Sequence, residues 1–238
     1  MRKIAILNFK GGTGKTTTAV NLSHALALSG KSVLVIDCDP QGSVAGWLGI
    51  NPEHTFFDLL TDQVSIENCI HHTREGMDVI PSDKRLTLIE VRLAQRENMG
   101  TAFLEKLSSL SKYDFVLLDC PPSMSILNLN ALEYAEEIFM PVSLDYLSLR
   151  GVRQVIESLP EGIEITKVIP TFYDQRTKKS KEILEDLKSF FKEKVTMPIR
   201  VNVRIAESSS FHKTIFEYDS KSRGAHDYWE LAKEILRG

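Results

Sequence analysis

The chain has 238 residues, of which 42% are hydrophobic and 26% are charged. This length and composition predict one globular domain, residues 1–238, with a substantial core and little room for a second domain. The formal net charge is −3, from 29 basic and 32 acidic residues, so any nucleic-acid contact must come from local clustering of charge. No apolar run approaches the ~18 residues of a membrane helix, and no signal-peptide core follows Arg2 and Lys3, so we expect a cytoplasmic protein.

Short apolar runs alternate with longer helical patterns along the chain. The predicted strands are residues 4–8, 33–37, 77–81, 115–119, 138–142 and 165–169. This alternation predicts an α/β fold, namely a doubly wound, mostly parallel sheet with helices on both faces. Apolar residues at helical spacing mark the faces of three helices. These residues are Ala19, Leu22 and Leu26 in the first helix, Ile183, Leu187, Phe190 and Phe191 in a later one, and Tyr228, Leu231, Ala232 and Ile235 in the last. Residues 42–73 are irregular, and we expect them to form surface insertions.

The strongest motif is the run Lys10-Gly11-Gly12-Thr13-Gly14-Lys15-Thr16-Thr17, between the first predicted strand and the first helix. Glycines let successive backbone N–H groups turn toward a phosphate, and the helix N-terminus adds partial positive charge. In such a loop Lys15 would reach the β- and γ-phosphates, and the Thr16 hydroxyl would ligate Mg²⁺. Phe9 stands where the standard P-loop pattern has its first glycine, and Lys10 is a second lysine. The sequence therefore predicts a nucleotide phosphate site with an unusual pattern.

Acidic residues end two of the predicted strands. Asp37 and Asp39 close the strand 33–37, and Asp119 closes the strand 115–119. Ligands of open parallel sheets lie beyond the carboxyl ends of the strands, so we expect these carboxylates beside the glycine loop. There they could hold Mg²⁺ or orient an attacking water. Each aspartate alone could instead cap a helix or form a turn.

Together these motifs resemble the deviant Walker A, Walker A′ and Walker B motifs of the ParA/MinD ATPases, at residues 10–16, 37–41 and 119–123. Residues 202–207 and 218–225 resemble the carboxyl-terminal signature of the small chromosomal, Soj-like ParA proteins. The resemblance implies a deviant Walker P-loop ATPase that binds ATP and Mg²⁺ and dimerises on ATP. It further implies non-specific DNA binding that ends on hydrolysis, a ParB-like centromere-binding partner, and a place on the nucleoid.

The resemblance also implies residue roles. Lys10 matches the lysine that reaches the partner's nucleotide across the dimer, Lys15 the lysine on the bound phosphates, and Asp39 the residue that positions the hydrolytic water. Thr16, Asp37 and Asp119 match residues around Mg²⁺. The implied nucleotide contacts are Lys10, Gly11, Gly12, Thr13, Gly14, Lys15, Thr16, Thr17 and, on the adenine side, Asn202. Arg200-Val201 stands where the family usually has Pro-Arg before that asparagine.

The segment 171–204 is locally basic, with nine basic and five acidic residues in a chain of net charge −3. Such a stripe is often only a solvated helix face. However, Arg176 and Arg204 match arginines through which Soj-like proteins contact DNA. Lys178, Lys179 and Lys181 could add contacts to DNA phosphates. No base-reading motif is visible, so we expect no sequence specificity.

Several alternatives have weaker support. A MinD-like membrane regulator would need a basic amphipathic tail after the last helix, and a metabolic P-loop enzyme such as dethiobiotin synthetase would ignore DNA. An iron protein of the nitrogenase type would need cluster cysteines elsewhere, and a GTPase would need an Asn-Lys-x-Asp motif that the chain lacks. We expect Cys38, Cys69 and Cys120 to be reduced buried thiols, His71 and His72 to lie in a surface loop, and Tyr228 and Trp229 to pack in the core.

Overall fold

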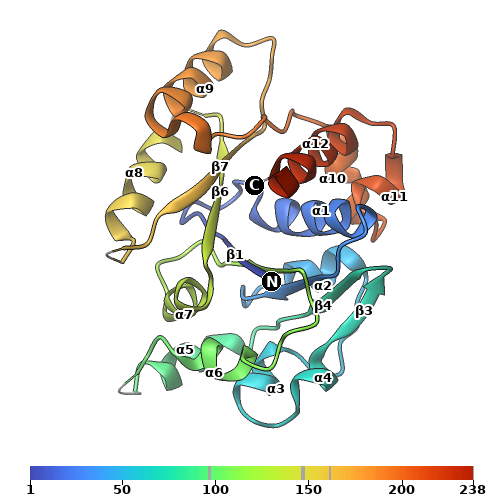
Figure 1. The fold of residues 1–238 in the computed structure, drawn as a ribbon, viewed down its shortest axis with the longest axis vertical. Helices are drawn as coiled ribbons and strands as arrows, with labels where there is room; N and C mark the ends of the chain where they lie inside the picture. The colour runs from blue at the N-terminus through green and yellow to red at the C-terminus, as the bar shows by residue number, and fades with distance from the viewer. Residues whose placement is uncertain (96–97, 146–147, 161, 238) are drawn as a thin grey trace.

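The computed structural model describes residues 1–95, 98–145, 148–160 and 162–237. Its strands form one sheet in the order β3-β4-β2-β5-β1-β6-β7 (Figure 1). The strands are β1 (Arg2–Ile6), β2 (Val33–Asp37), β3 (His71–Arg74), β4 (Met77–Ile80), β5 (Phe115–Asp119), β6 (Glu137–Ser143) and β7 (Ile165–Thr171). Neighbouring strands are parallel except β3 and β4, which are antiparallel. The prediction of a mostly parallel α/β sheet is confirmed.

Helices cover both faces of this sheet (Figure 1). One face packs against α1 (Lys15–Leu28), α2 (Ser43–Leu48), α10 (Val203–Ser210), α11 (Ile215–Asp219) and α12 (Arg223–Arg237). The other face packs against α3 (Phe56–Leu60), α4 (Ile66–Cys69), α5 (Leu86–Leu93), α6 (Ala102–Leu107), α7 (Ile126–Tyr134), α8 (Ser148–Ser158) and α9 (Lys178–Phe191), the last followed by the 3₁₀ turn η1 (Lys192–Lys194). The sheet is therefore doubly wound.

The alternation of side chains along the central strands explains the two cores. In β1, Ile4 and Ile6 lie in the cluster beneath α1 and α12, whereas Ala5 belongs to the cluster beneath α7. Successive residues of a strand point to opposite faces, so a strand covered on both sides must be apolar throughout. For this reason β2 and β5, which are buried at every position, were readable in the sequence as continuous apolar runs.

Two expectations about local structure are wrong. Residues 42–73 are not surface insertions: they form α2, α3 and α4 and begin β3, and they bury Phe56, Phe57 and Cys69. Helices of four to six residues are too short to display a hydrophobic period. His71 and His72 lie in the antiparallel edge strand β3 and not in a loop, because a mostly polar strand gives no apolar signal.

The expected helix faces are largely confirmed. Ala19, Leu22 and Leu26 of α1 are completely buried, as are Leu231 and Ala232 of α12. Phe190 of α9 is the exception, because 70% of this residue is exposed. The three cysteines are buried and free, which confirms their prediction. In the parts of the chain that the structure describes, every helix is too short or too polar to cross a bilayer.

Candidate nucleotide-binding site

The glycine loop connects the end of β1 to the start of α1. Gly12 and Gly14 have φ angles of 72° and 91°, in the left-handed region that suits glycine. The carbonyl of Gly14 accepts the first helical hydrogen bond from the backbone N–H of Thr18, at 2.8 Å. The buried hydroxyl of Thr171, at the end of β7, donates to the carbonyl of Thr13 at 2.8 Å. The end of β7 thus holds the loop, and a glycine-rich loop of this kind can turn its N–H groups toward an anion.

Lys15 is buried inside this loop, with 7% of the residue exposed. Its ammonium group donates to the carbonyl of Lys10 at 3.2 Å. Burial lowers the pKa of Lys15, and the nearby carboxylates of Asp119 and Asp39 oppose that shift. The cation is therefore held within the cradle, where a phosphate would replace the water that it has lost.

The carboxyl ends of β2 and β5 bring the predicted aspartates together. Asp37 and Asp119 are paired in register on these two strands, and the N–H of Cys38 donates to the carbonyl of Asp119 at 3.0 Å. Each carboxylate oxygen of Asp37 accepts one backbone N–H bond at 3.0 Å, from Asp39 and from Val44. Asp37 therefore shapes the turn into α2, and this contact presents the half-buried Asp39 at the sheet edge.

Asp119 has both carboxylate oxygens buried, and neither has a hydrogen-bond partner of good geometry among the described residues. Burial raises the pKa of Asp119, while the Thr16 hydroxyl and the Lys15 ammonium act in the opposite direction. A buried carboxylate beside a hydroxyl is a donor set that suits Mg²⁺, which typically takes one or two protein oxygens together with substrate phosphates. The residues present therefore fit a magnesium ion between Thr16, Asp119 and a bound nucleotide.

Lys10 forms an ion pair within its own chain. Its ammonium lies 2.8 and 2.7 Å from the two carboxylate oxygens of Asp145, which also accepts from the Ser143 hydroxyl at 2.7 Å. Sequence reasoning missed Asp145. It lies two residues beyond the carboxyl end of β6, so the rule that located Asp39 and Asp119 would also have found it.

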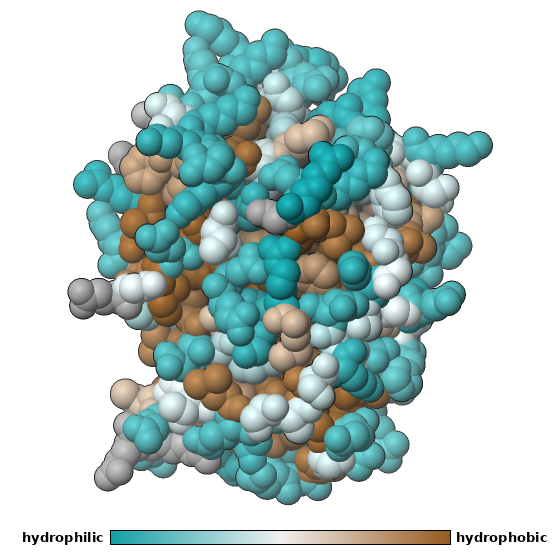
Figure 2. Space-filling view, in the orientation of Figure 1, coloured by the Kyte–Doolittle hydropathy of each residue, from teal (hydrophilic) through white to brown (hydrophobic). Residues whose placement is uncertain are grey.

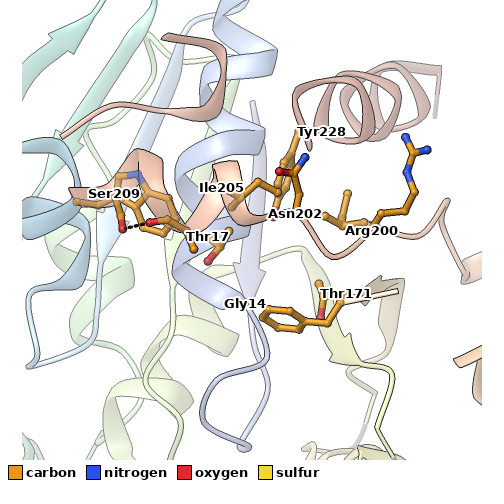
Figure 3. A pocket seen from close by; sticks show the side chains of 12 residues that line it. Gly14, Thr17, Thr171, Arg200, Asn202, Ile205, Ser209 and Tyr228 are labelled. Carbon is orange, nitrogen blue, oxygen red and sulfur yellow. Dashed lines mark hydrogen bonds between the residues drawn. The ribbon is translucent and has the colours of Figure 1, made fainter. Parts of the chain in front are cut away.

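A pocket of about 260 Å³ opens beside the loop, between the start of α1, the end of β7 and α10 (Figure 3). Gly14, Thr17 and Asn202 line it, together with Thr171, Phe172, Trp47, Ile199, Arg200, Ile205, Ala206, Ser209 and Tyr228. The structure thus brings Asn202 to the phosphate loop from almost 190 residues away in sequence.

Asn202 is the N-cap of α10. Its Oδ1 accepts the backbone N–H of Arg204 at 2.9 Å, which orients the amide and leaves Nδ2 as the donor group. The unusual Arg200 extends away from the other labelled residues (Figure 3), and its guanidinium pairs with the buried Asp227 of α12. Arg200 therefore anchors the segment before Asn202 to the last helix.

The predicted DNA-contacting residues are not among those that line this pocket, although Arg204 is bonded to Asn202 at its edge. Arg176 precedes α9, Lys178 and Lys179 are its first residues, and Arg204 is in the first turn of α10. Arg176 is 87% exposed in its side chain and pairs with Asp174, whereas Arg204 is 51% exposed and pairs with Glu207. Figure 2 shows hydrophilic side chains gathered where α9 lies, at the top of the view.

The sheet is doubly wound, and a glycine loop, a buried loop lysine and acidic strand ends lie at one edge of it. Together these features define a P-loop ATPase of the α/β class. A family model described as an AAA domain matches residues 1–168. The chromosome partitioning protein ParA of Caulobacter vibrioides is 37% identical, with 99% of this chain and 94% of that protein covered. The chromosome-partitioning ATPase Soj of Thermus thermophilus is 40% identical, with 99% and 96% covered. The chain belongs to the ParA/Soj family of partition ATPases.

Solved structures support the same fold. The structure titled cobyrinic acid a,c-diamide synthase from Mycobacterium smegmatis, with bound ADP and magnesium, has a TM-score of 0.85 and 30% identity. The match covers all of this chain and 94% of that chain. The expected family, fold and ATPase activity are therefore confirmed, whereas the roles of individual site residues stay predictions.

Proposed function

We propose that this chain is a single-domain partition ATPase that binds ATP and Mg²⁺ and that two chains close into a dimer around two nucleotides. In that state it binds DNA without sequence preference, and hydrolysis separates the dimer and releases the DNA. The observation that carries the proposal is the convergence of Lys15, Asp39 and Asp119 at the glycine loop of a ParA/Soj-family chain.

The chain's own residues account for the chemistry of hydrolysis. The loop N–H groups and Lys15 bind and neutralise the phosphates, and Thr16 and Asp119 would hold Mg²⁺, which would supply further charge stabilisation. Asp39, presented by the Asp37 turn, orients the attacking water. Phosphoryl transfer leaves little covalent work to the protein, so a slow basal rate that a partner raises is physically reasonable.

The dimer depends on Lys10. In the proposed closed state, Lys10 leaves Asp145 and contacts the nucleotide of the other subunit. The exchange replaces a partly exposed ion pair by contacts to a polyanion inside a dry interface, where charge interactions are stronger.

The DNA surface is proposed to combine Arg176 and Arg204 with Lys178 and Lys179. The two arginines follow segments that are joined by hydrogen bonds, because the N–H of Tyr173 donates to Ile199 and the N–H of Val201 donates to Tyr173. A monomer offers few phosphate contacts, whereas a dimer offers twice as many, and the second set binds at high effective concentration. ATP therefore controls DNA binding through dimerisation.

We further propose that a ParB-like centromere-binding protein stimulates hydrolysis and so positions a chromosome, plasmid or other cargo over the nucleoid. The match to curated partition proteins across nearly the whole chain supports this partner class.

The test compares wild type with Lys10→Ala, Asp39→Ala and Arg204→Glu in dimerisation, ATPase and DNA-binding assays. We expect Asp39→Ala to stay dimeric and DNA-bound with ATP, Lys10→Ala to remain monomeric, and Arg204→Glu to dimerise without binding DNA. The control is Lys112→Glu, which reverses an exposed charge just before β5, at the end of this strand that lies away from Asp119. This variant should bind DNA normally. If Arg204→Glu binds DNA as tightly as Lys112→Glu does, the proposed surface is wrong.

A further inference from the structure

Phe172, the first residue after β7, has an unusual backbone conformation. Its φ angle is +54°, in the left-handed region that glycine and asparagine adopt readily and that a bulky side chain rarely adopts. Such a residue persists only where its surroundings impose the conformation, and residues of this kind cluster at functional sites.

Both neighbours of Phe172 are fixed. The Thr171 hydroxyl donates to the glycine loop at Thr13, and its carbonyl accepts the N–H of Leu144 at 3.1 Å. Tyr173 is bound through its N–H and its carbonyl to the segment before Asn202, at 3.0 and 3.1 Å. The chain is thus tied to the phosphate loop on one side and to the segment before α10 on the other.

Burial of the ring does not offset the free-energy cost of this strained backbone. Phe172 is 50% exposed, although an aromatic ring of this size usually packs in a core. One ring carbon lies 4.0 Å from the position that a Cβ on Gly14 would occupy, so the ring overhangs the end of the phosphate loop.

Two hollows meet at this ring. One is the pocket that holds Asn202 and Tyr228, and the other is lined by Lys10, Gly11, Gly12 and Asp145. Of the residues that the structure describes, Phe172 alone lines both hollows.

We propose that Phe172 is a nucleotide-positioning residue whose ring packs against the base and ribose of bound ATP. Every purine has an apolar face that an exposed aromatic ring can cover. The left-handed backbone aims the ring across the boundary between the two hollows, so the stacked nucleotide directs its phosphates toward the loop. This inference rests on the proposed placement of the base beside Asn202.

The test measures binding of Mg·ATP and of Mg·tripolyphosphate by calorimetry, without DNA. The variants are Phe172→Gly, Phe172→Leu and Phe172→Tyr, with Phe190→Ala as the control for loss of an exposed phenylalanine in α9. Glycine removes the ring and relieves the backbone, leucine keeps an apolar side chain without the aromatic face, and tyrosine keeps the ring.

We expect Phe172→Gly to weaken ATP binding about tenfold, Phe172→Leu to weaken it severalfold, and Phe172→Tyr and Phe190→Ala to bind ATP as wild type does. Tripolyphosphate has no base or ribose, so its affinity should be the same in all variants. The melting temperature of Phe172→Gly should not fall, because glycine fits the φ angle. A merely structural residue would instead lose stability together with affinity.

Unchanged ATP binding in Phe172→Gly, or an equal loss for ATP and tripolyphosphate, would overturn the inference. Asn202→Ala separates this failure from failure of the base placement. If Asn202→Ala weakens ATP binding and Phe172→Gly does not, the base lies in the pocket and only the role of Phe172 is wrong. If neither variant affects ATP, the base binds elsewhere.

Discussion

The ammonium of Lys10 contacts both carboxylate oxygens of Asp145 within one chain, at 2.8 Å from Oδ1 and 2.7 Å from Oδ2. A lysine that is to contact a partner's nucleotide must first leave this carboxylate. The side chains are 29% and 43% exposed, so the pair is partly solvated and breaking it costs little. Surface pairs of this kind contribute about 0.2–1 kcal/mol. If Lys10 contacts the partner's nucleotide as proposed, this ion pair disfavours the dimer without preventing it.

Asp145→Asn should dimerise at a lower ATP concentration than wild type. The expected shift is no more than about fivefold, because 1.4 kcal/mol corresponds to a factor of ten. Sedimentation velocity across an ATP titration, in the Asp39→Ala background, measures it. Glu185→Gln, which breaks the exposed Lys188–Glu185 pair of α9, should leave the titration unchanged. A higher ATP requirement in Asp145→Asn would mean that Asp145 supports the closed state instead.

Gly224→Ala should weaken ATP binding by disturbing Asn202. A Cβ on Gly224 would lie 2.7 Å from two side-chain atoms of Ile205 and 3.0 Å from the Asn202 amide nitrogen, so these side chains, or α10 with them, must move. Overpacking of this kind costs about 1–3 kcal/mol of stability. Gly46→Ala in α2 is the matched control, because no atom lies within 4 Å of the added carbon. Chemical denaturation and ATP calorimetry compare the two variants, and equal behaviour would contradict the argument.

His24 should make the fold less stable in mild acid. Burial lowers the pKa of His24, Arg74 lowers it further, and Glu217 opposes the shift. The unfolded chain therefore takes up a proton near pH 6.5 while the folded chain does not, so stability falls as the pH drops below about 6.5 toward the folded pKa. Melting curves of wild type and His24→Asn at pH 7.5 and 5.5 test this. The variant should lose less stability between the two pH values, and an equal loss would contradict the assignment.

DNA binding by the ATP-bound dimer should depend steeply on salt. The four arginines of the dimer alone, two from each chain, contribute about −3.6 to the slope of log affinity against log salt, at about −0.9 per neutralised phosphate, and any phosphate contacts of Lys178 and Lys179 make the slope steeper. Arg176→Ala should reduce the slope by about 1.8, because a dimer loses two contacts. Fluorescence anisotropy with DNA of unrelated sequences measures both slopes, and a sequence-dependent affinity would argue against phosphate recognition.

Much of this site was predictable because its parts lie at the ends of apolar strands. β2 and β5 are buried on both faces, so their runs end visibly at Asp37 and Asp119. The edge strand β3 was not predictable, since its four residues are all polar and are half-buried or exposed without an apolar alternation, which resembles a loop.

Other features depend on tertiary contacts and leave no local pattern. The pairing of Lys10 with Asp145 joins residues 135 positions apart, and the φ angle of Phe172 is imposed by hydrogen bonds to three distant segments. Phe190 fits the apolar spacing of α9, but it is exposed, and the adjacent Phe191 packs against the core instead.

The central claim is that two chains close around ATP, each contributing Lys10 to the other. Light scattering on Asp39→Ala with saturating Mg·ATP tests it most directly, beside the double variant Lys10→Ala/Asp39→Ala. We expect a mass of two chains for the first protein and of one chain for the second. A single-chain mass for Asp39→Ala, or a dimer that survives the loss of Lys10, would contradict it.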